Sequence, residues 1–236
     1  MRGGIAVTDD LFEKKSYTCR NEVKSISIRE ITGEIVVQKD NVDHVTVSYY
    51  DRDDEPDYEI KESDGELSII RKKRIHLFNF DIFRHTMTVT IPGDLEGELN
   101  ITNKSGSIQI SRISAKKVAI DNVTGNIRLE DVVSKDDLTV NNTSGSVTLE
   151  NVKADEDVDV SNTTGRIEVD RLKCGGNISL RNVTGSISGT IDGKKSDYSV
   201  STKVVTGSSS LENSSPGKKK LKVSTTTGSI KLSFTE

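Results

Sequence analysis

The chain has 236 residues, of which 32% are hydrophobic and only 4% aromatic, with no Trp. So few large apolar side chains would not fill the thick core of a barrel enzyme, and we therefore expect a thin or narrow core. The 3 Pro and the net charge of -4, from 33 basic and 37 acidic residues, argue against a disordered chain and give no reason to expect a nucleic-acid partner.

Residues 1–22 form a lead segment with no apolar stretch behind a basic region, so we expect neither a secretory signal nor a membrane anchor in it. A cytoplasmic protein and an exported protein whose leader was removed both fit this pattern.

The two cysteines, Cys19 and Cys174, lack the paired spacing of a zinc site or a disulfide framework. Cys174 is predicted to be a free thiol in a loop.

Apolar residues alternate with polar ones from Ile26 to Val37, on either side of Gly33. This period of two predicts two short strands joined by a turn. Four further alternating segments follow at irregular spacing, at 45–49, 58–60, 67–69 and 87–91. We therefore predict irregular N-terminal coils over residues 23–98, joined by longer loops.

The segment 71–85 breaks this alternation and contains three of the five Phe in the chain. Apolar and basic side chains together suit an anionic membrane surface or a protein partner, so the segment is a candidate interaction loop with possible membrane contact. The favoured alternative is a cap that covers an open end of the fold. The residues that define the candidate loop are Arg71, Lys72, Lys73, Arg74, Phe78, Phe80 and Phe83.

A phrase of the form Asn-x-Thr/Ser-Gly-x-Ile/Val repeats through residues 99–236, with successive glycines 19, 20, 20, 20, 22 and 21 residues apart. Apolar columns stand seven and five residues before each glycine and two and four residues after it. A further column follows at Ile113, Val132, Val152 and Leu172. The pattern predicts an all-β, parallel β-solenoid (β-helix) with about 20 residues per coil, in which neighbouring coils bury one another's inward columns. We expect one domain over 1–236.

The turn columns have a structural explanation. Glycine permits positive φ or close approach of the next coil, and an asparagine three residues earlier is expected to stack as a hydrogen-bonded ladder. This requirement also generates Asn-x-Ser/Thr glycosylation motifs without implying glycosylation. The predicted turn glycines are Gly33, Gly106, Gly125, Gly145, Gly165, Gly185, Gly207 and Gly228, and the asparagines are Asn103, Asn122, Asn142, Asn162 and Asn182.

The order of these segments resembles a known family. The alternating coil at 26–37 is followed by strands at 58–60, 65–69 and 88–92, and the last leads into the repeat at 99–108. In this order the chain is similar to the bacterial putative-adhesin family of β-strand-repeat domains of unknown function. The resemblance implies a right-handed solenoid, a bacterial source and a location in the cell envelope or outside the cell, with the cytoplasm as the alternative.

Acidic residues recur on successive coils, but each set has a simpler explanation than chemistry. Carboxylates five residues after the glycines could act as acid and base or bind calcium, as could the acidic return loops. A solvated charged face is the favoured interpretation, and the three histidines lack metal-ligand spacing. The residues concerned are Glu130, Glu150 and Asp170, flanked by Arg112, Asp131, Asn151 and Arg171; Asp136, Asp137, Asp155, Glu156, Asp157 and Asp159 in the loops; and His44, His76 and His85.

We therefore predict no catalytic, cofactor-binding or metal-binding residue. The expected function is a non-enzymatic structural or adhesive module that presents a ladder-like lateral surface to a protein or cell-surface ligand. An envelope-sensing regulatory protein or a self-associating scaffold, and so a homo-oligomer, is the alternative. A carbohydrate-active β-helix enzyme is a more distant one, because no aromatic platform adjoins the carboxylates.

Overall fold

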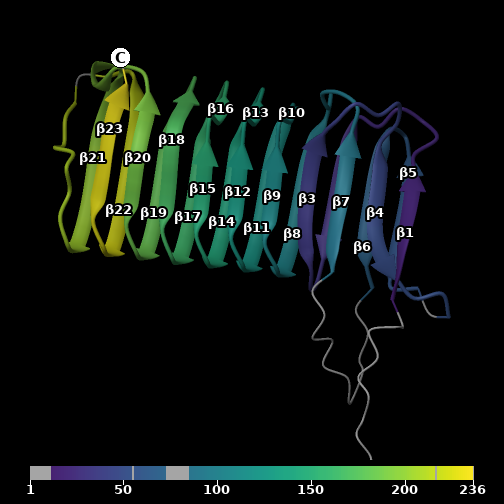
Figure 1. Ribbon diagram of the computed structural model, residues 1–236. Coiled ribbons are helices and arrows are strands. Elements are labelled where there is room, and N and C mark those ends of the chain that lie inside the picture. Colours follow the sequence, from purple (N-terminus) through teal and green to yellow (C-terminus); the bar gives the residue numbers. More distant parts are fainter. Residues whose placement is uncertain (1–11, 55, 73–84, 216, 236) are drawn as a thin grey trace, which may run out of the picture.

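The computed structural model describes residues 12–54, 56–72, 85–215 and 217–235. Within these residues the protein is all-β and solenoid-like, and the strands form a 13-stranded and a 10-stranded sheet, called here sheet A and sheet B. The sheets face each other over one elongated row of coils (Figure 1). The described part of the chain contains no helix long and apolar enough to cross a membrane.

Each repeat of the middle region contributes one strand to sheet B, a glycine corner, one strand to sheet A and a short return. The sheet B strands are β8 (Glu98–Ser105), β11 (Lys117–Thr124), β14 (Leu138–Ser144), β17 (Val158–Thr164) and β19 (Ile178–Thr184). The sheet A strands are β9 (Ile108–Ser111), β12 (Ile127–Glu130), β15 (Val147–Glu150), β18 (Ile167–Cys174) and β20 (Ile187–Asp192). The short returns are β10 (Ser114–Ala115), β13 (Val133–Ser134) and β16 (Lys153–Ala154).

Successive repeats pair in parallel with matching positions side by side. Val118 pairs with Leu138, and Leu138 with Val158, so each inward side chain lies on its counterpart in the next repeat. Val147 and Val160 have 0% exposed surface, which confirms the inward assignment of the apolar columns. The column at Ile113, Val132, Val152 and Leu172 is buried as well; its first three members immediately precede the short returns, and Leu172 lies in β18.

At the C-terminal end the coils do not follow chain order. Strand β22 (Lys219–Thr227) lies between β19 and β21 (Tyr198–Thr206), and β23 (Ile230–Thr235) pairs with β20. The repeat at Gly228 therefore precedes the repeat at Gly207 in the stack, the reverse of their order in the sequence. Thr202 and Ser209 occupy columns that are apolar elsewhere, and a polar repeat fits best at the end of a stack, where less of the surface is covered.

The N-terminal end is also out of chain order. Strands β2 (Ser25–Glu30) and β3 (Glu34–Lys39) lie against β8 and β9, whereas β6 (Glu66–Arg71) and β7 (Thr86–Ile91) stack outside them. The outermost strands are β1 (Glu13–Thr18), β4 (Thr46–Asp51) and β5 (Tyr58–Ser63).

These outermost strands are antiparallel to their neighbours, which corrects the prediction of parallel coils over this region. The reversal between β5 and β6 comes from a two-residue turn, Asp64–Gly65, with φ of 51° and 78°. Positive φ at both positions is the hairpin geometry that Asp-Gly favours, so the sequence does contain a signal for this hairpin. Strand β1, within the predicted lead segment, is also part of sheet A.

Candidate functional site

The predicted turn glycines form one continuous corner between the two sheets. Their spatial order is Gly33, Gly106, Gly125, Gly145, Gly165, Gly185, Gly228 and Gly207, and every N–H before Gly207 donates to the carbonyl that precedes the next glycine. Gly145 has a φ of 127°, and a Cβ at this position would overlap the Gly125 carbonyl. The coils therefore approach more closely here than any side chain permits.

The asparagines three residues before these glycines are buried and bind the same corner. The Asn142 Nδ2 donates to the Gly125 carbonyl at 3.2 Å, and Asn162 does the same to Gly145 at 3.0 Å. Thr225 occupies the equivalent position in β22, and its Oγ1 donates to the Gly185 carbonyl at 2.9 Å. The ladder thus links each asparagine to the backbone of the preceding coil.

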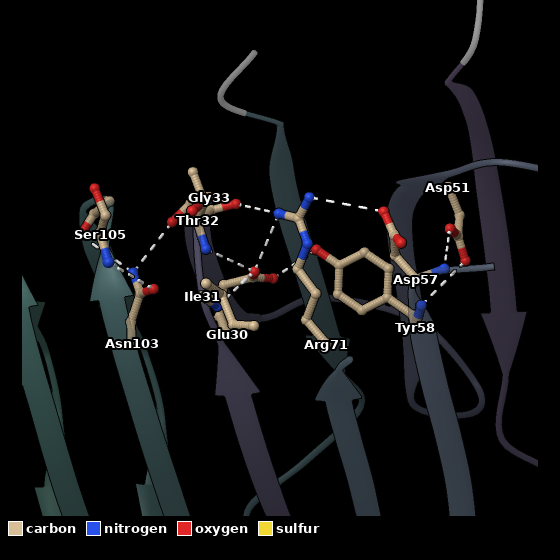
Figure 2. Close-up of polar contacts among 11 residues, drawn as sticks. Glu30, Ile31, Thr32, Gly33, Asp51, Asp57, Tyr58, Arg71, Asn103 and Ser105 are labelled. Atoms are coloured by element: carbon tan, nitrogen blue, oxygen red, sulfur yellow. Dashed lines mark hydrogen bonds and ion pairs between the residues drawn. The ribbon is translucent and has the colours of Figure 1, made fainter. Parts of the chain in front are cut away.

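At the N-terminal end of this ladder, the position of the asparagine is taken by Glu30, which pairs in register with Asn103 (Figure 2). Its carboxylate is buried and accepts hydrogen bonds from the N–H groups of Ile31 at 2.8 Å and Thr32 at 3.1 Å. The Arg71 guanidinium lies 3.3 Å from the carboxylate of Glu30 and also donates to the Thr32 carbonyl. A buried charge pair thus replaces the neutral amide.

The network continues outward through β5. The Tyr58 hydroxyl donates to Glu30 at 2.5 Å, and Asp51 accepts the N–H groups of Asp57 at 2.7 Å and Tyr58 at 3.3 Å. Burial and the nearby Glu30 carboxylate raise the pKa of Tyr58 well above its usual value, so the phenol stays protonated and remains a donor. Sequence reasoning missed this cluster, because its members are far apart in the chain.

Arg71 and Lys72 are the members of the candidate interaction loop that the structure describes. Arg71 ends β6, and its guanidinium faces Glu30 and Asp57 inside the protein, whereas Lys72 is exposed. The other loop residues, Lys73, Arg74, Phe78, Phe80 and Phe83, lie outside the described residues, as does His76. The assignment of 71–85 as a cap or an interaction loop therefore stays a prediction.

The carboxylates that recur on sheet A lie next to one another, and basic side chains pair with them. Glu130 pairs in register with Glu150, and the Arg128 guanidinium lies within 3.5 Å of Glu130 and 2.5 Å of Glu150. Asp170 accepts from the Thr190 hydroxyl at 2.9 Å. Among the described residues, no group of three His, Cys, Asp or Glu is arranged to hold a metal ion.

The acidic side chains of the return loops also form ion pairs and hydrogen bonds with their neighbours. Asp155 pairs with Lys153 at 2.7 Å, and the Asp157 carboxylate accepts from the side chain and backbone of Asn177. Cys174 is buried beneath these loops, and its thiol donates to the Glu156 carbonyl. Burial raises the pKa of Cys174 to about 11, so the thiol is protonated at neutral pH and a weak nucleophile.

Exposed β-branched side chains form a line along the glycine corner, which we call the Val/Thr ridge. Its members stand two residues before six of the eight corner glycines, those from Gly125 to Gly207 in the stack: Val123, Thr143, Thr163, Val183, Thr226 and Val205. The parallel register of the flanking residues places them on successive coils. Val123 and Val183 are each 48% exposed, and Val205 is 67% exposed. In the sequence, the ridge is marked by the recurrent Val or Thr at the first unspecified position of the phrase Asn-x-Thr/Ser-Gly-x-Ile/Val.

The chain is similar to several solved structures. A putative adhesin from Bacteroides fragilis is 17% identical, covers 94% of this chain and 97% of its own, and has a TM-score of 0.51. A putative cell adhesion protein from Clostridium sporogenes is 12% identical over 94% of this chain and 100% of its own, with a TM-score of 0.39. A putative lipid binding protein from Parabacteroides distasonis is 13% identical over 95% and 98%, with a TM-score of 0.38.

No curated protein matches the chain. The family comparison is more informative, since the match includes all of sheet B, all of sheet A except β1, and the glycine corner. The model of the Toastrack DUF4097 family matches residues 23–236, and the chain therefore belongs to this family.

Proposed function

We propose that this protein is a non-enzymatic adhesive module of the bacterial cell envelope that binds another macromolecule along the Val/Thr ridge. The observation that carries the proposal is the position of the exposed large hydrophobic side chains. Within the described residues these are Val123, Val183 and Val205, and all three stand in this one column. Scattered apolar side chains need no explanation, but these three share one column with exposed Thr side chains, and we take this continuous β-branched column as the interaction surface.

The construction of the corner supports this proposal. A partner that runs along the ridge meets a similar side chain at each coil, about 4.8 Å apart. The Gly and Asn ladders behind the ridge hold the backbone in place, so little conformational freedom is left to lose on binding. We infer a right-handed coil of about 20 residues, the hand that parallel crossovers take almost without exception.

The location in the cell envelope or outside the cell is part of the same proposal. It is supported by the names of proteins of similar fold, which include a putative adhesin. Fractionation of cells that express the native gene with a C-terminal tag tests it. Recovery in the envelope or the medium agrees with the proposal, whereas recovery in the cytoplasm alone contradicts it.

The ridge is tested with the triple variant Val123→Lys, Val183→Lys and Val205→Lys, measured by cosedimentation with isolated bacterial envelopes. Because the three side chains are exposed, we expect an unchanged melting temperature and at least a tenfold loss of binding. The matched control adds the same charge on the outward face of sheet A, through Gln109→Lys, Thr148→Lys and Ser188→Lys. Equal binding by the two triple variants would contradict the assignment of the ridge.

A self-associating scaffold is the second candidate, favoured by the edge strand β21. On its outer edge the N–H groups of Val200 and Thr202 donate to Ser214 and Asn213. By alternation the N–H of Val204 also faces outward, toward a position that a strand from another copy would occupy. Val204→Pro removes that N–H. A concentration-dependent rise in mass that this variant abolishes, measured by sedimentation velocity, supports the scaffold, and a monomer at every concentration excludes it.

A further inference from the structure

A pocket of about 390 Å³ opens at the N-terminal end of the molecule, far along the chain from the ridge. Three segments line it: residues 21–23 before β2, residues 43–45 before β4, and residues 91–95 after β7. None of these residues belongs to the ridge or to the network around Glu30.

The pocket lies where the column of short returns ends. The Leu95 N–H donates to the Ser114 carbonyl at 2.8 Å, which continues the β10, β13 and β16 column, and the Gly97 N–H donates to Lys24 at 2.8 Å. Beyond this point β4 and β1 run antiparallel to their neighbours and add no further return strand to the column. The side of the core that short returns cover in the regular repeats is therefore open here.

The floor of the pocket is apolar and its rim is acidic. Val45, Ile91 and Leu95 belong to the buried core, with at most 4% of their surface exposed. Glu22, Asp43 and Asp94 stand at the rim and are exposed.

Only one of these three rim carboxylates takes part in an ion pair among the described residues. Asp94 pairs with Lys39 at 3.1 Å, whereas Glu22 and Asp43 form no ion pair with any other described residue. A negative rim above an apolar floor is complementary to a cation carried on an apolar chain. The carboxylates come from different segments, and no three are arranged to hold a metal ion within the described chain, which favours an organic cation.

We propose that this pocket binds a primary ammonium group on a short aliphatic chain. The chain packs on Val45 and Leu95, and the ammonium group lies between the carboxylates of Glu22 and Asp43. A free alkylamine and a lysine side chain of a protein partner both carry this chemistry. The inference is independent of the proposed adhesive role of the ridge.

The test is an NMR titration of the full chain with n-hexylammonium chloride, followed through the backbone amide signals. We expect saturable shifts centred on residues 21–23, 43–45 and 91–95, weakened by added salt as screened charges require. n-Hexanol, which has the same chain without the charge, is expected to bind at least tenfold more weakly. Equal binding of the two compounds, or shifts elsewhere in the protein, would overturn the proposal.

Two variants separate the charge from the cavity. Glu22→Gln with Asp43→Asn is expected to weaken hexylammonium at least tenfold and to leave the hexanol affinity unchanged. Gly93→Leu is expected to weaken both compounds, because Gly93 lines the pocket and a Cβ at this position meets no heavy atom within 4 Å. Unchanged hexylammonium affinity in both variants contradicts the site.

The source of the cation is resolved by a second titration, with N-acetyl-lysine amide. Affinity equal to that of hexylammonium indicates a lysine side chain as the natural occupant, and affinity at least tenfold lower indicates a free amine. Failure of both ligands to shift the pocket amides overturns the proposal. The envelope-binding assay on the ridge variants does not depend on this outcome, so the two proposals fail separately.

Discussion

The middle of the molecule and its N-terminal end have different side chains at the buried position three residues before the corner glycine. Both have a glycine corner and apolar inward columns. In the middle, the position three residues before the corner glycine is Asn, whose side-chain amide donates to the glycine carbonyl of the preceding coil. At the end that position is Glu30, whose charge is met by Arg71 at the end of β6, the next strand outward. A periodic stack propagates through nearest neighbours, but its termination needs contacts that do not repeat.

The largest expected effect is in the middle, where the core is narrow. Val147→Asp places an unpaired charge at a position with 0% exposure and should lower the free energy of unfolding by about 4 kcal/mol or more. Thr148→Asp, one residue along and pointing outward beside Arg128, should cost less than about 1 kcal/mol. Urea denaturation of both variants measures the difference. Equal midpoints would show that the inward and outward assignment is wrong.

At the N-terminal end, Arg71→Ala leaves the buried Glu30 carboxylate without its cation and should cost about 3–5 kcal/mol. Lys61→Ala is the matched control, because Lys61 forms an ion pair with Glu59 in β5 but is exposed, and its loss should cost less than about 1 kcal/mol.

Adding Glu30→Gln to Arg71→Ala should recover part of the lost stability, because it removes the unpaired charge. Thermal denaturation of the two single variants and the double variant provides the comparison. Additive losses in the double variant would contradict the coupling of Glu30 with Arg71.

The glycine corner should be more sensitive to steric overlap than to φ alone. Gly145 and Gly193 have similar φ values of 127° and 131°, but a Cβ would overlap the Gly125 carbonyl only at Gly145, and at Gly193 it meets nothing within 4 Å. Gly193→Ala should cost about 1–2 kcal/mol through backbone strain, and Gly145→Ala about 1–3 kcal/mol more. Equal chemical denaturation midpoints would mean that close approach of the coils contributes nothing.

The asparagine ladder allows a finer comparison with its natural exception, Thr225. Asn142→Ala removes a hydrogen bond to the Gly125 carbonyl and should cost about 1–2 kcal/mol. Asn142→Thr should cost less, because Thr225 makes the equivalent bond to Gly185 at the same position in β22. Melting temperatures of the two variants decide this, and a Thr variant less stable than the Ala variant would contradict it.

The smallest expected effect is pH dependence at the N-terminal end. The Tyr17 hydroxyl donates to Glu62 at 2.6 Å and lowers the pKa of that carboxyl below its usual value of 4.5. Because the folded-state pKa is depressed, the contribution to stability is present above about pH 4.5 and is lost as the pH falls through the folded-state value. Glu62→Gln should therefore flatten the dependence of stability on pH below 4.5. Parallel profiles for Glu62→Gln and wild type would contradict this link.

The sequence by itself determined the repeating part of the fold. Alternation identifies strands, and spacing near 20 residues aligns Val118 with Leu138 and Leu138 with Val158, as the structure has them. This information is local, because each coil contacts only its neighbours and the same residue types return at the same positions. The Val/Thr ridge could have been predicted from the sequence for the same reason, since its members recur two residues before the corner glycines.

The tertiary structure alone decided how the stack ends. The order of β21 and β22 and the antiparallel strands β1 and β4 do not follow from spacing, because a repeat pattern specifies which residues face inward but not which repeat is outermost. Glu30 and Arg71 are 41 residues apart and meet because β6 stacks on β2. The pocket beside Leu95 arises in the same way: it lies between three segments that only the packing of the end strands brings together, so no local pattern marks it.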